Sequence, residues 1–350
     1  MDLTDASPVL HTFVLGSPPW ETCDPFLFCV HHDDAYPAGN SALGPDASRL
    51  QGRPIGSDFT GTDGWSMYHG STVPGFPQHP HRGFETITFV RRGYVDHADS
   101  LRAAARYGAG DVQWLTAGAG IVHAEMFPLL RDDEGNHMEL FQIWMNLPAA
   151  DKMTDPHFAM LWAEDIPIFD ELDPNGRRAT ITVVAGAIGP HMPPHPPPAS
   201  WASKADANVA IWRVALEPGA SWTMPTAPDG TIRTVYVFDG GGIDLSGYGA
   251  ALGTGTVLDA SRSVTATAGD AAVTLLVLQG RPIGEPVSQY GPFVMNDRAG
   301  IEQAFHDYQR TQFGGWPWPT DDPTHGHATA RFVRRPDGSL ELPPDTSAVG

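Results

Sequence analysis

The 350 residues of the chain are 41% hydrophobic and 18% charged, which argues against intrinsic disorder along the whole length. Acidic residues outnumber basic ones by 41 to 21, and a formal net charge of −20 without a Lys/Arg-rich stripe disfavours direct binding to nucleic acid. The 38 glycines and 33 prolines would interrupt long helices, so they favour short strands joined by turns.

The start of the chain carries no pattern typical of export or of a membrane anchor. Residues 1–10 hold acidic side chains and lack the basic and apolar regions of a signal peptide. No apolar run approaches the roughly 20 residues that span a bilayer. Cys23 and Cys29 are expected to be reduced thiols rather than a disulfide. These features predict a soluble, cytoplasmic protein with no membrane contact.

Taken in chain order, most of the predicted elements are strands. Apolar or alternating runs that end at Gly, Pro or Asn predict them at residues 85–90, 139–145, 210–216, 234–238 and 271–278. The strand composition and the dense turns predict an all-β sandwich or barrel. A weak internal repeat favours two related β-domains.

The last sixty residues are expected to hold one helix and a small hairpin. Asn296 or Asp297 can cap a helix that runs to about Arg310 and carries an apolar stripe. Two short apolar runs flank the turn sequence at 336–338, which predicts a hairpin.

The histidines are distributed unevenly, and this is the first indication of function. Of the 15, twelve precede residue 200 and three follow residue 300, and residues 201–290 contain neither His nor Cys. Any site built from imidazoles must therefore lie outside that stretch.

Two segments carry residue pairs that could bind one metal ion. His79 and His81 are two residues apart in a predicted strand, so both side chains face the same side. Pro80 between them places the pair at an edge, a bulge or a strand entry. His123 and Glu125 have the same spacing. Three imidazoles and one carboxylate suit a mononuclear transition metal of the Fe, Ni, Mn, Cu or Co type.

These two segments resemble those of a known family. Residues 75–93 are similar to the first cupin motif, and residues 76–86 resemble its pirin form. Residues 110–126 are similar to the partner motif, and further matches lie at 141–148 and 290–296. The chain thus resembles the pirin family of the cupin superfamily from about residue 55 to residue 315.

The resemblance implies a bicupin, with two jelly-roll barrels face to face and a C-terminal helix. It implies a mononuclear metal, usually iron, in the N-terminal barrel, with His79, His81, His123 and Glu125 as ligands. The C-terminal barrel of pirins typically has no ligands. Many other cupins place their carboxylate ligand at the position of Glu85, which here is expected to play a supporting role. Gln113 and Gln142 are candidates to orient the ligands.

On this basis the chain is expected to divide into four segments. Residues 1–54 would form an N-terminal extension that packs on the barrels, and 55–170 the metal-binding barrel. Residues 171–292 would form the second barrel, with a Pro-rich insert at 189–198, and 293–350 the helix and tail hairpin.

Other histidines are expected to be structural. Residues 31–34 read His-His-Asp-Asp, but adjacent residues of a strand face opposite ways, which disfavours a second metal cluster. His97 is expected at the rim of the site as a hydrogen-bonded residue. The two histidines of the insert, His191 and His195, are expected in an extended surface loop.

Two functions are compatible with the motif. In the first, the protein resembles quercetin 2,3-dioxygenases, which open a flavonol with O2 and release carbon monoxide, and Glu125 is both ligand and base. Trp65, Phe76 and Trp114 are candidates for an apolar pocket wall, with core packing as the alternative. In the second, the protein is a regulator that acts through protein partners and uses its metal as a redox or structural element.

Overall fold

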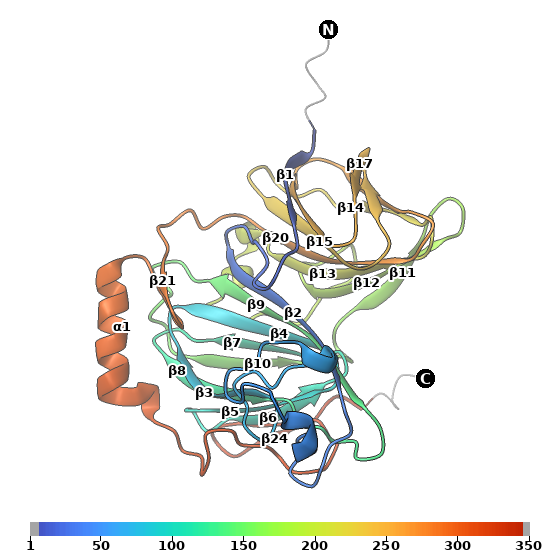
Figure 1. The fold of residues 1–350 in the computed structure, drawn as a ribbon. Helices are drawn as coiled ribbons and strands as arrows, with labels where there is room; N and C mark the ends of the chain where they lie inside the picture. Colours follow the sequence, from blue (N-terminus) through green and yellow to red (C-terminus); the bar gives the residue numbers. More distant parts are fainter. Residues whose placement is uncertain (1–6, 346–350) are drawn as a thin grey trace. The chain divides into compact units, whose positions relative to one another are not determined.

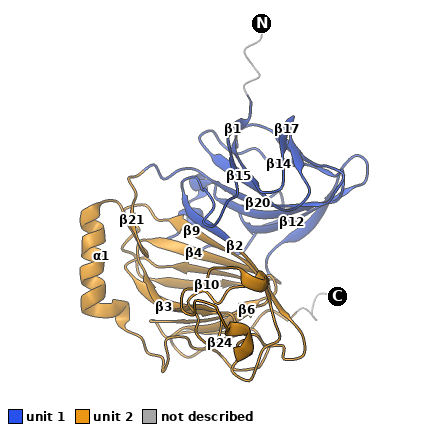
Figure 2. Ribbon diagram, viewed as in Figure 1, with its two compact units in different colours: residues 1–30, 165–284 blue, residues 31–164, 285–350 orange. Residues whose placement is uncertain are grey.

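Figure 1 shows the computed structural model, which describes residues 7–345. Strands dominate, and α1 (Arg298–Thr311) is the one α-helix in this described range. Residues 7–30 and 165–284 form one compact unit, unit 1, and residues 31–164 and 285–345 form the other, unit 2 (Figure 2). The expected all-β class with a C-terminal helix is confirmed.

Unit 1 consists of two sheets whose inner faces share one apolar core. The larger sheet contains, in order, β1 (Val9–Val14), β18 (Thr254–Asp259), β15 (Ile232–Gly240), β20 (Val273–Gly280), β13 (Ala210–Leu216), β12 (Arg178–Ala185) and β11 (Ile168–Leu172). The smaller contains β14 (Ser221–Met224), β19 (Val264–Ala268), β16 (Ile243–Leu245) and β17 (Tyr248–Ala250). The predicted strands at 210–216, 234–238 and 271–278 correspond to β13, β15 and β20.

Unit 2 also contains two larger sheets, and its core draws residues from both. The first contains β10 (His157–Leu161), β7 (Val112–Thr116), β4 (Phe84–Arg92), β9 (Asn136–Asn146) and β2 (Phe26–Tyr36), whose first residues, up to Val30, belong to unit 1. The second contains β24 (Leu340–Glu341), β23 (Phe332–Arg334), β6 (Ala104–Gly108), β5 (Tyr94–Asp99), β8 (Ile121–Met126) and β3 (Gly75–His81).

Short elements complete the two units. They are the hairpin of β21 (Ser288–Tyr290) and β22 (Phe293–Met295), and the 3-10 turns η1 (Ala47–Leu50), η2 (Thr62–Gly64), η3 (Trp201–Ser203), η4 (Ala205–Ala207) and η5 (Gln312–Gly314).

These units do not coincide with the four predicted segments. The N-terminal residues contribute strands rather than only packing on the surface, since β1 pairs with β18 and β2 is the neighbour of β9. The C-terminal residues belong with the first half of the chain, because β23 pairs with β6. Pairings this distant in sequence leave no local signal in the composition of the segments.

The C-terminal helix follows its sequence signals closely. Of the two residues predicted as its cap, Asp297 takes that place, and its carboxylate accepts a hydrogen bond from the Gly300 N–H at 2.7 Å. Ile301 and Ala304 are buried against Phe293, as the apolar stripe predicts. The hairpin predicted around 336–338 is present as β23 and β24.

Two further observations concern sequence predictions. Cys23 and Cys29 form no disulfide, and Cys29 is buried. Within the described range, none of the helical segments has the length and apolar character needed to cross a bilayer.

A buried ion pair between Arg53 and Asp58 stabilises the loop that precedes β3. Arg53 Nη1 donates to Asp58 Oδ2 at 2.9 Å, and both side chains are almost wholly buried. Burial alone would raise the pKa of Asp58, but hydrogen bonds from the Thr60 hydroxyl, the Met67 N–H and Arg53 outweigh it and lower the pKa to about 2.

This lowered pKa predicts a loss of stability in acid. The ordinary pKa of Asp is about 3.9, so the folded state stabilises the charged form of Asp58 relative to the unfolded state. The charged form therefore contributes about 2 kcal/mol to the free energy of unfolding, and this contribution is complete at pH values above about 3.9. It falls as the pH approaches 2, and about half is lost at pH 3. Urea unfolding of wild type and Asp58→Asn at pH 7 and pH 3 should show this difference shrinking.

The matched control is Asp63→Asn, because Asp63 is 67% exposed and lies 3.9 Å from the same arginine. Its effect on the free energy of unfolding should be small at both pH values. A difference between wild type and Asp58→Asn that stays constant with pH would contradict the assignment.

Candidate metal centre

The first pair of predicted ligands lies on an edge strand that carries a bulge. β3 pairs antiparallel with β8, and the register shifts between Phe76 and His79. Beyond the shift, His79 lies opposite His123, and Pro80 lies opposite Val122. Because Pro80 has no N–H to donate, an edge position suits it. The pairing thus brings the His-x-His and His-x-Glu segments together.

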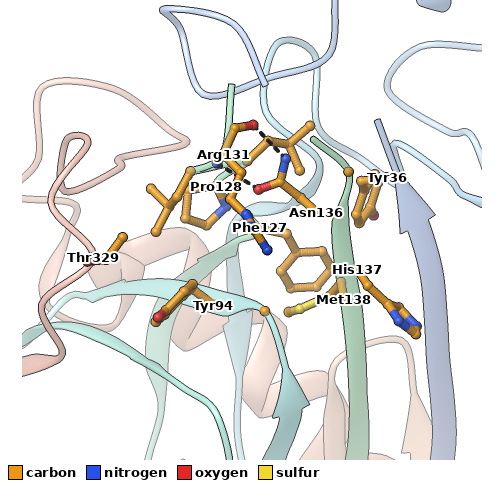
Figure 3. Close-up of a pocket in the computed structure, with 13 residues that line it drawn as sticks. Tyr36, Tyr94, Phe127, Pro128, Arg131, Asn136, His137, Met138 and Thr329 are labelled. Atoms are coloured by element: carbon orange, nitrogen blue, oxygen red, sulfur yellow. Dashed lines mark hydrogen bonds between the residues drawn. The ribbon is translucent and has the colours of Figure 1, made fainter. Parts of the chain in front are cut away.

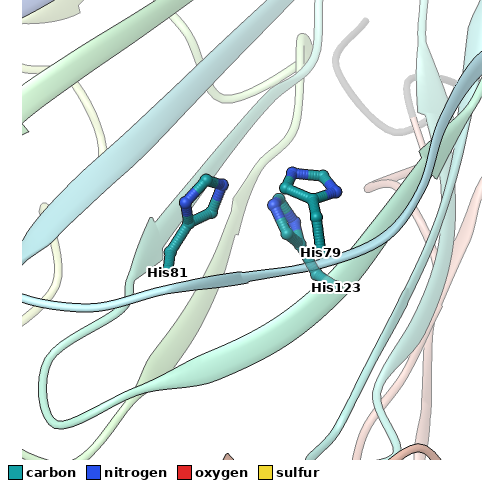
Figure 4. Close-up of side chains that lie close together, drawn as sticks. All are labelled: His79, His81 and His123. Atoms are coloured by element: carbon teal, nitrogen blue, oxygen red, sulfur yellow. The ribbon is translucent and has the colours of Figure 1, made fainter. Parts of the chain in front are cut away.

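The three histidines converge from these two strands, as Figure 4 shows. One ring nitrogen of each lies within 4.8 Å of the corresponding nitrogens of the other two. The ring centroid of His123 is 4.5 Å from that of His79 and 4.9 Å from that of His81. His81 and His123 are buried, and His79 is half-buried.

The protonation and the partners of these rings fit a metal ion. Burial lowers the pKa of His79 to about 4 and lowers the pKa values of His81 and His123 well below their usual range. All three are therefore neutral at pH 7, the form in which imidazole donates a lone pair to a metal. Both ring nitrogens of His123 are buried and lack a hydrogen-bond partner in the structure. A bound ion would satisfy one of them.

Glu125 lies near this group but outside the set of mutually close nitrogens. Its side chain is 4% exposed, and donors approach both oxygens. Oε1 lies 3.0 Å from the Thr88 hydroxyl and 3.4 Å from the Tyr107 hydroxyl, and Oε2 accepts from Gln142 Nε2 at 2.9 Å. Burial raises the pKa of Glu125, and nearby His97 opposes that shift. Its role as the fourth ligand stays a prediction.

The three residues predicted to support the ligands lie in different places. Gln142 contacts Glu125 directly. Gln113 lies one contact further away, since its Oε1 accepts from the Tyr107 hydroxyl at 3.3 Å. Glu85 is fully buried and accepts from the Thr116 hydroxyl at 2.7 Å. Glu85 is three residues from Thr88 on β4, so the two side chains point to opposite faces and Glu85 turns away from Glu125.

His97 and Asp99 form a buried pair beside the predicted ligands. β5 runs antiparallel to β8, and places His97 opposite Glu125 and Asp99 opposite His123. His97 Nε2 is 3.2 Å from Asp99 Oδ2, both side chains are 0% exposed, and His97 Nδ1 has no partner. His97 is hydrogen-bonded as expected, but it is buried rather than at a rim, because β5 lies between β6 and β8 in the sheet.

Sequence reasoning missed Thr88 and Tyr107. Thr88 lies in the middle of β4, where a Thr is an ordinary strand residue, and Tyr107 lies on β6. Thr88 is three residues from Glu85, so strand parity combined with the expected supporting role of Glu85 would have placed Thr88 on the opposite face from the ligands. No local pattern points to Tyr107.

Aromatic rings surround the histidines. The Phe76 ring centroid is 6.3 Å from that of His79, and the Trp144 centroid is 5.3 Å from that of His81. Both side chains are half-buried, so they can meet a ligand. Trp65 and Trp114 are buried instead, as core packing predicts.

The alternate side chains of the His-His-Asp-Asp run at 31–34 contact different partners, and His32 and Asp34 share the Tyr68 hydroxyl. His31 contacts Glu139 at 3.1 Å, and His32 contacts the Tyr68 hydroxyl at 2.8 Å, so the adjacent rings point to different partners. Asp33 pairs with His137 at 2.6 Å. These contacts agree with the structural role expected for these residues.

Unit 2 also contains a cavity of about 450 Å³ (Figure 3). None of the four predicted ligands lines it. Tyr36, Tyr94 and Phe127 contribute rings to its wall, and the Asn136 side chain is fixed by hydrogen bonds with the backbone of Arg131. Among the described residues, its lining provides no cluster of metal-ligating groups.

Comparison with known proteins gives concordant matches over both halves of the chain. Residues 14–145 match the family described as Pirin, and residues 211–314 match the Pirin C-terminal cupin domain. A Pseudomonas aeruginosa protein named as a candidate quercetin 2,3-dioxygenase is 37% identical over 239 residues, which is 68% of this chain and 79% of that protein. A Caulobacter vibrioides pirin-like protein is 33% identical over 320 residues, 89% of this chain and 95% of that one.

Solved structures agree with these sequence matches. The crystal structure of a quercetin 2,3-dioxygenase from Acinetobacter baumannii superposes with a TM-score of 0.69 at 26% identity. The match covers 88% of this chain and 98% of that one. The fold thus has a counterpart in a protein of known structure.

Proposed function

The chain belongs to the pirin family of two-domain cupins, and from this membership we propose that it is a metal-dependent dioxygenase for a flavonol-like phenolic substrate. The observation that carries the proposal is the cluster of three neutral histidines, two of them buried, with two unpartnered nitrogens on His123. The names of the similar quercetin 2,3-dioxygenases supply the substrate class.

In the proposed site, His79, His81 and His123 hold one transition metal, with iron as the first candidate, and Glu125 is its fourth protein ligand. When bound, the ion would lower the pKa of a phenolic hydroxyl and bring the substrate together with O2. Both atoms of O2 enter the products, and one ring carbon leaves as carbon monoxide.

Glu125 is also the proposed base, which accepts the proton of the substrate hydroxyl. Two features support this role. Glu125 is almost fully buried, so bulk water does not compete for the proton that its carboxylate would accept. The contacts with Thr88, Tyr107 and Gln142 fix its orientation, so little reorganisation accompanies the transfer.

The aromatic rings beside the histidines suit a phenolic ligand. Phe76 and Trp144 are half-buried and border His79 and His81. Flat rings of this kind stack favourably on a bicyclic phenol and keep water away from the reacting atoms.

The test is an aerobic assay with quercetin on protein of measured metal content, with oxygen uptake and carbon monoxide release as readouts. Glu125→Gln should lower kcat by about 100-fold or more, because general base catalysis typically contributes 10²–10⁴-fold. Glu302→Gln is the matched control, since Glu302 lies on the exposed face of α1, and it should leave turnover unchanged.

A fully loaded wild-type protein that consumes no oxygen with quercetin or related flavonols would contradict the enzymatic proposal. The regulatory hypothesis, in which the metal-loaded protein acts through a protein partner, would then be the one to test.

A further inference from the structure

A buried histidine beside the candidate metal centre has one ring nitrogen without a partner. His97 lies on β5, its side chain is 0% exposed, and its Nδ1 makes no hydrogen bond within the described residues. The ring centroid of His97 is 5.5 Å from that of His123, and the two ring planes are inclined at 57°. A wholly buried polar atom that is left without a partner calls for an explanation, because native folds contain few of them.

Asp99 fixes the other ring nitrogen of His97. Its Oδ2 lies 3.2 Å from His97 Nε2, and its Oδ1 accepts hydrogen bonds from the Leu101 and Ala103 N–H groups, each at 2.9 Å. The backbone carbonyl of Asp99 accepts from the Trp318 indole at 2.8 Å. Hydrogen bonds thus hold both the side chain and the backbone of Asp99 in one position.

This contact determines which nitrogen of His97 carries the proton. An ionised carboxylate only accepts hydrogen bonds, so His97 Nε2 is the donor. In a neutral imidazole Nδ1 then carries the lone pair and is an acceptor. The backbone carbonyl of His97 accepts from His325 Nε2 at 2.9 Å, which further fixes the strand at this point. His97 therefore presents an immobilised acceptor that no donor in the described residues uses.

His123 has the complementary requirement. Both of its ring nitrogens are buried and without a partner. If a metal ion takes the lone pair of one nitrogen, the other nitrogen carries the single N–H of the neutral ring. A metal-bound histidine almost always donates this N–H to an acceptor, which orients the ring and makes it a more basic ligand. His97 Nδ1 is an acceptor of this kind.

The pairing of β5 with β8 places the two rings on the same face. Asp99 lies opposite His123, and His97 lies opposite Glu125, so all four side chains share one side of the sheet. No direct hydrogen bond joins the two rings in the structure. Rotation about the bond between Cβ and the ring of a histidine has a broad, soft preference. The His123 ring can therefore turn toward His97 as it binds an ion, while its Cβ stays in place.

We propose that His97 is a positioning residue of the metal centre: its Nδ1 accepts the hydrogen bond from the His123 nitrogen that does not bind the ion, and Asp99 fixes the tautomer that makes this possible. The inference rests on the metal centre of the proposed function and is independent of its substrate. It gives the buried His97–Asp99 pair a role in the orientation and basicity of a ligand, beyond the structural role expected from the sequence.

The test is titration of the full-length protein with Co(II) alone, followed by its visible absorption. His97→Phe keeps a flat ring but removes the acceptor, so it should lower the affinity for Co(II) by about 10–100-fold and change the absorption bands. His97→Asn returns an oxygen acceptor close to the place of Nδ1 and should recover most of the affinity. His69→Phe is the matched control, because His69 is exposed, lies 5.8 Å from Phe76 and contacts the Gly56 carbonyl.

Asp99→Asn tests the role of the tautomer. The Asn oxygen can still accept from the Leu101 and Ala103 N–H groups, but its NH2 would donate to His97 Nε2 and move the proton of that ring to Nδ1. The affinity for Co(II) should fall about as far as in His97→Phe. Because both substitutions remove the same hydrogen bond, the double variant should lose no more affinity than His97→Phe alone. Two unrelated structural defects would add instead.

NMR of the imidazole nitrogens in zinc-loaded wild type keeps the test decisive if the variants do not fold. It should show the proton of His97 on Nε2 and a hydrogen-bonded N–H on His123. A proton on Nδ1 of His97, an unchanged affinity in His97→Phe, no recovery in His97→Asn, or additive losses in the double variant would overturn the proposal. Wild type that binds no Co(II) would overturn the metal centre with it, whereas an absence of quercetin turnover would overturn only the enzymatic proposal.

Discussion

Replacing His123 with alanine is expected to abolish transition-metal binding, with a loss of affinity of more than about 100-fold. Removing a residue that hydrogen-bonds to a metal ligand already lowers metal affinity by about 10–100-fold, and removing one of the three imidazole ligands should lower it further. The ring of His123 faces both other histidines and has no protein hydrogen bond to maintain. The readouts are metal content per chain after reconstitution and the metal-dependent rise in Tm.

The fold should survive this substitution. Removing the ring leaves a small cavity, which lowers the free energy of unfolding, but it also removes two buried, unpartnered nitrogens, which raises it. His306→Ala is the matched control, because His306 is exposed on α1. A His123→Ala protein that retains one ion per chain at wild-type affinity would contradict the assigned site.

The second large effect concerns stability rather than metal binding. Asp96→Asn should lower the free energy of unfolding by about 3–5 kcal/mol, because it leaves the Arg106 charge buried without its counter-ion. Asp96 accepts from Arg106 Nε at 2.7 Å and Nη2 at 2.6 Å, and from the His325 N–H at 2.8 Å. Both members of the ion pair are essentially unexposed. Thermal unfolding should show a Tm lower by roughly 10 °C.

The double variant Asp96→Leu with Arg106→Met distinguishes the effect of an unpaired buried charge from the effect of altered side-chain packing. It removes both charges together, so it should recover much of the stability that the single variant loses. Asp170→Asn is the control for an exposed pair, since Asp170 and its partner Arg178 are about half exposed and such pairs contribute little. A loss below about 1 kcal/mol in Asp96→Asn would show that the buried pair is not a major source of stability.

The three histidines of the candidate metal centre could be predicted to lie together because their arrangement is mostly local. Strand periodicity alone places His79 with His81 and His123 with Glu125, and the pairing of β3 with β8 then joins the two pairs. The limits of α1 were equally local, because Asp297 caps its start. The family resemblance added the barrel architecture to these local inferences.

Features that depend on distant pairings escaped prediction. The His97–Asp99 pair reaches the centre only because β5 lies beside β8. Burial of Arg233 depends on Gln279, which is 46 residues away in sequence. The N-terminal strands show the same limit, since β1 finds its partner in β18, near residue 256. The hydrophobic pattern of a strand shows which of its faces is buried, but it does not determine which strand pairs with it.

The tail strands also bear on how this protein resists self-association. β23 pairs with β6 along its outer edge. Glu341, on β24, accepts a hydrogen bond from the Trp162 indole at 2.9 Å. Without these residues β6 would present a row of open backbone donors and acceptors, the kind of edge onto which a second chain adds in aggregation. The final hairpin therefore covers the edge of the sheet. Removing the residues from Phe332 onward would expose the unpaired edge of β6 and favour self-association.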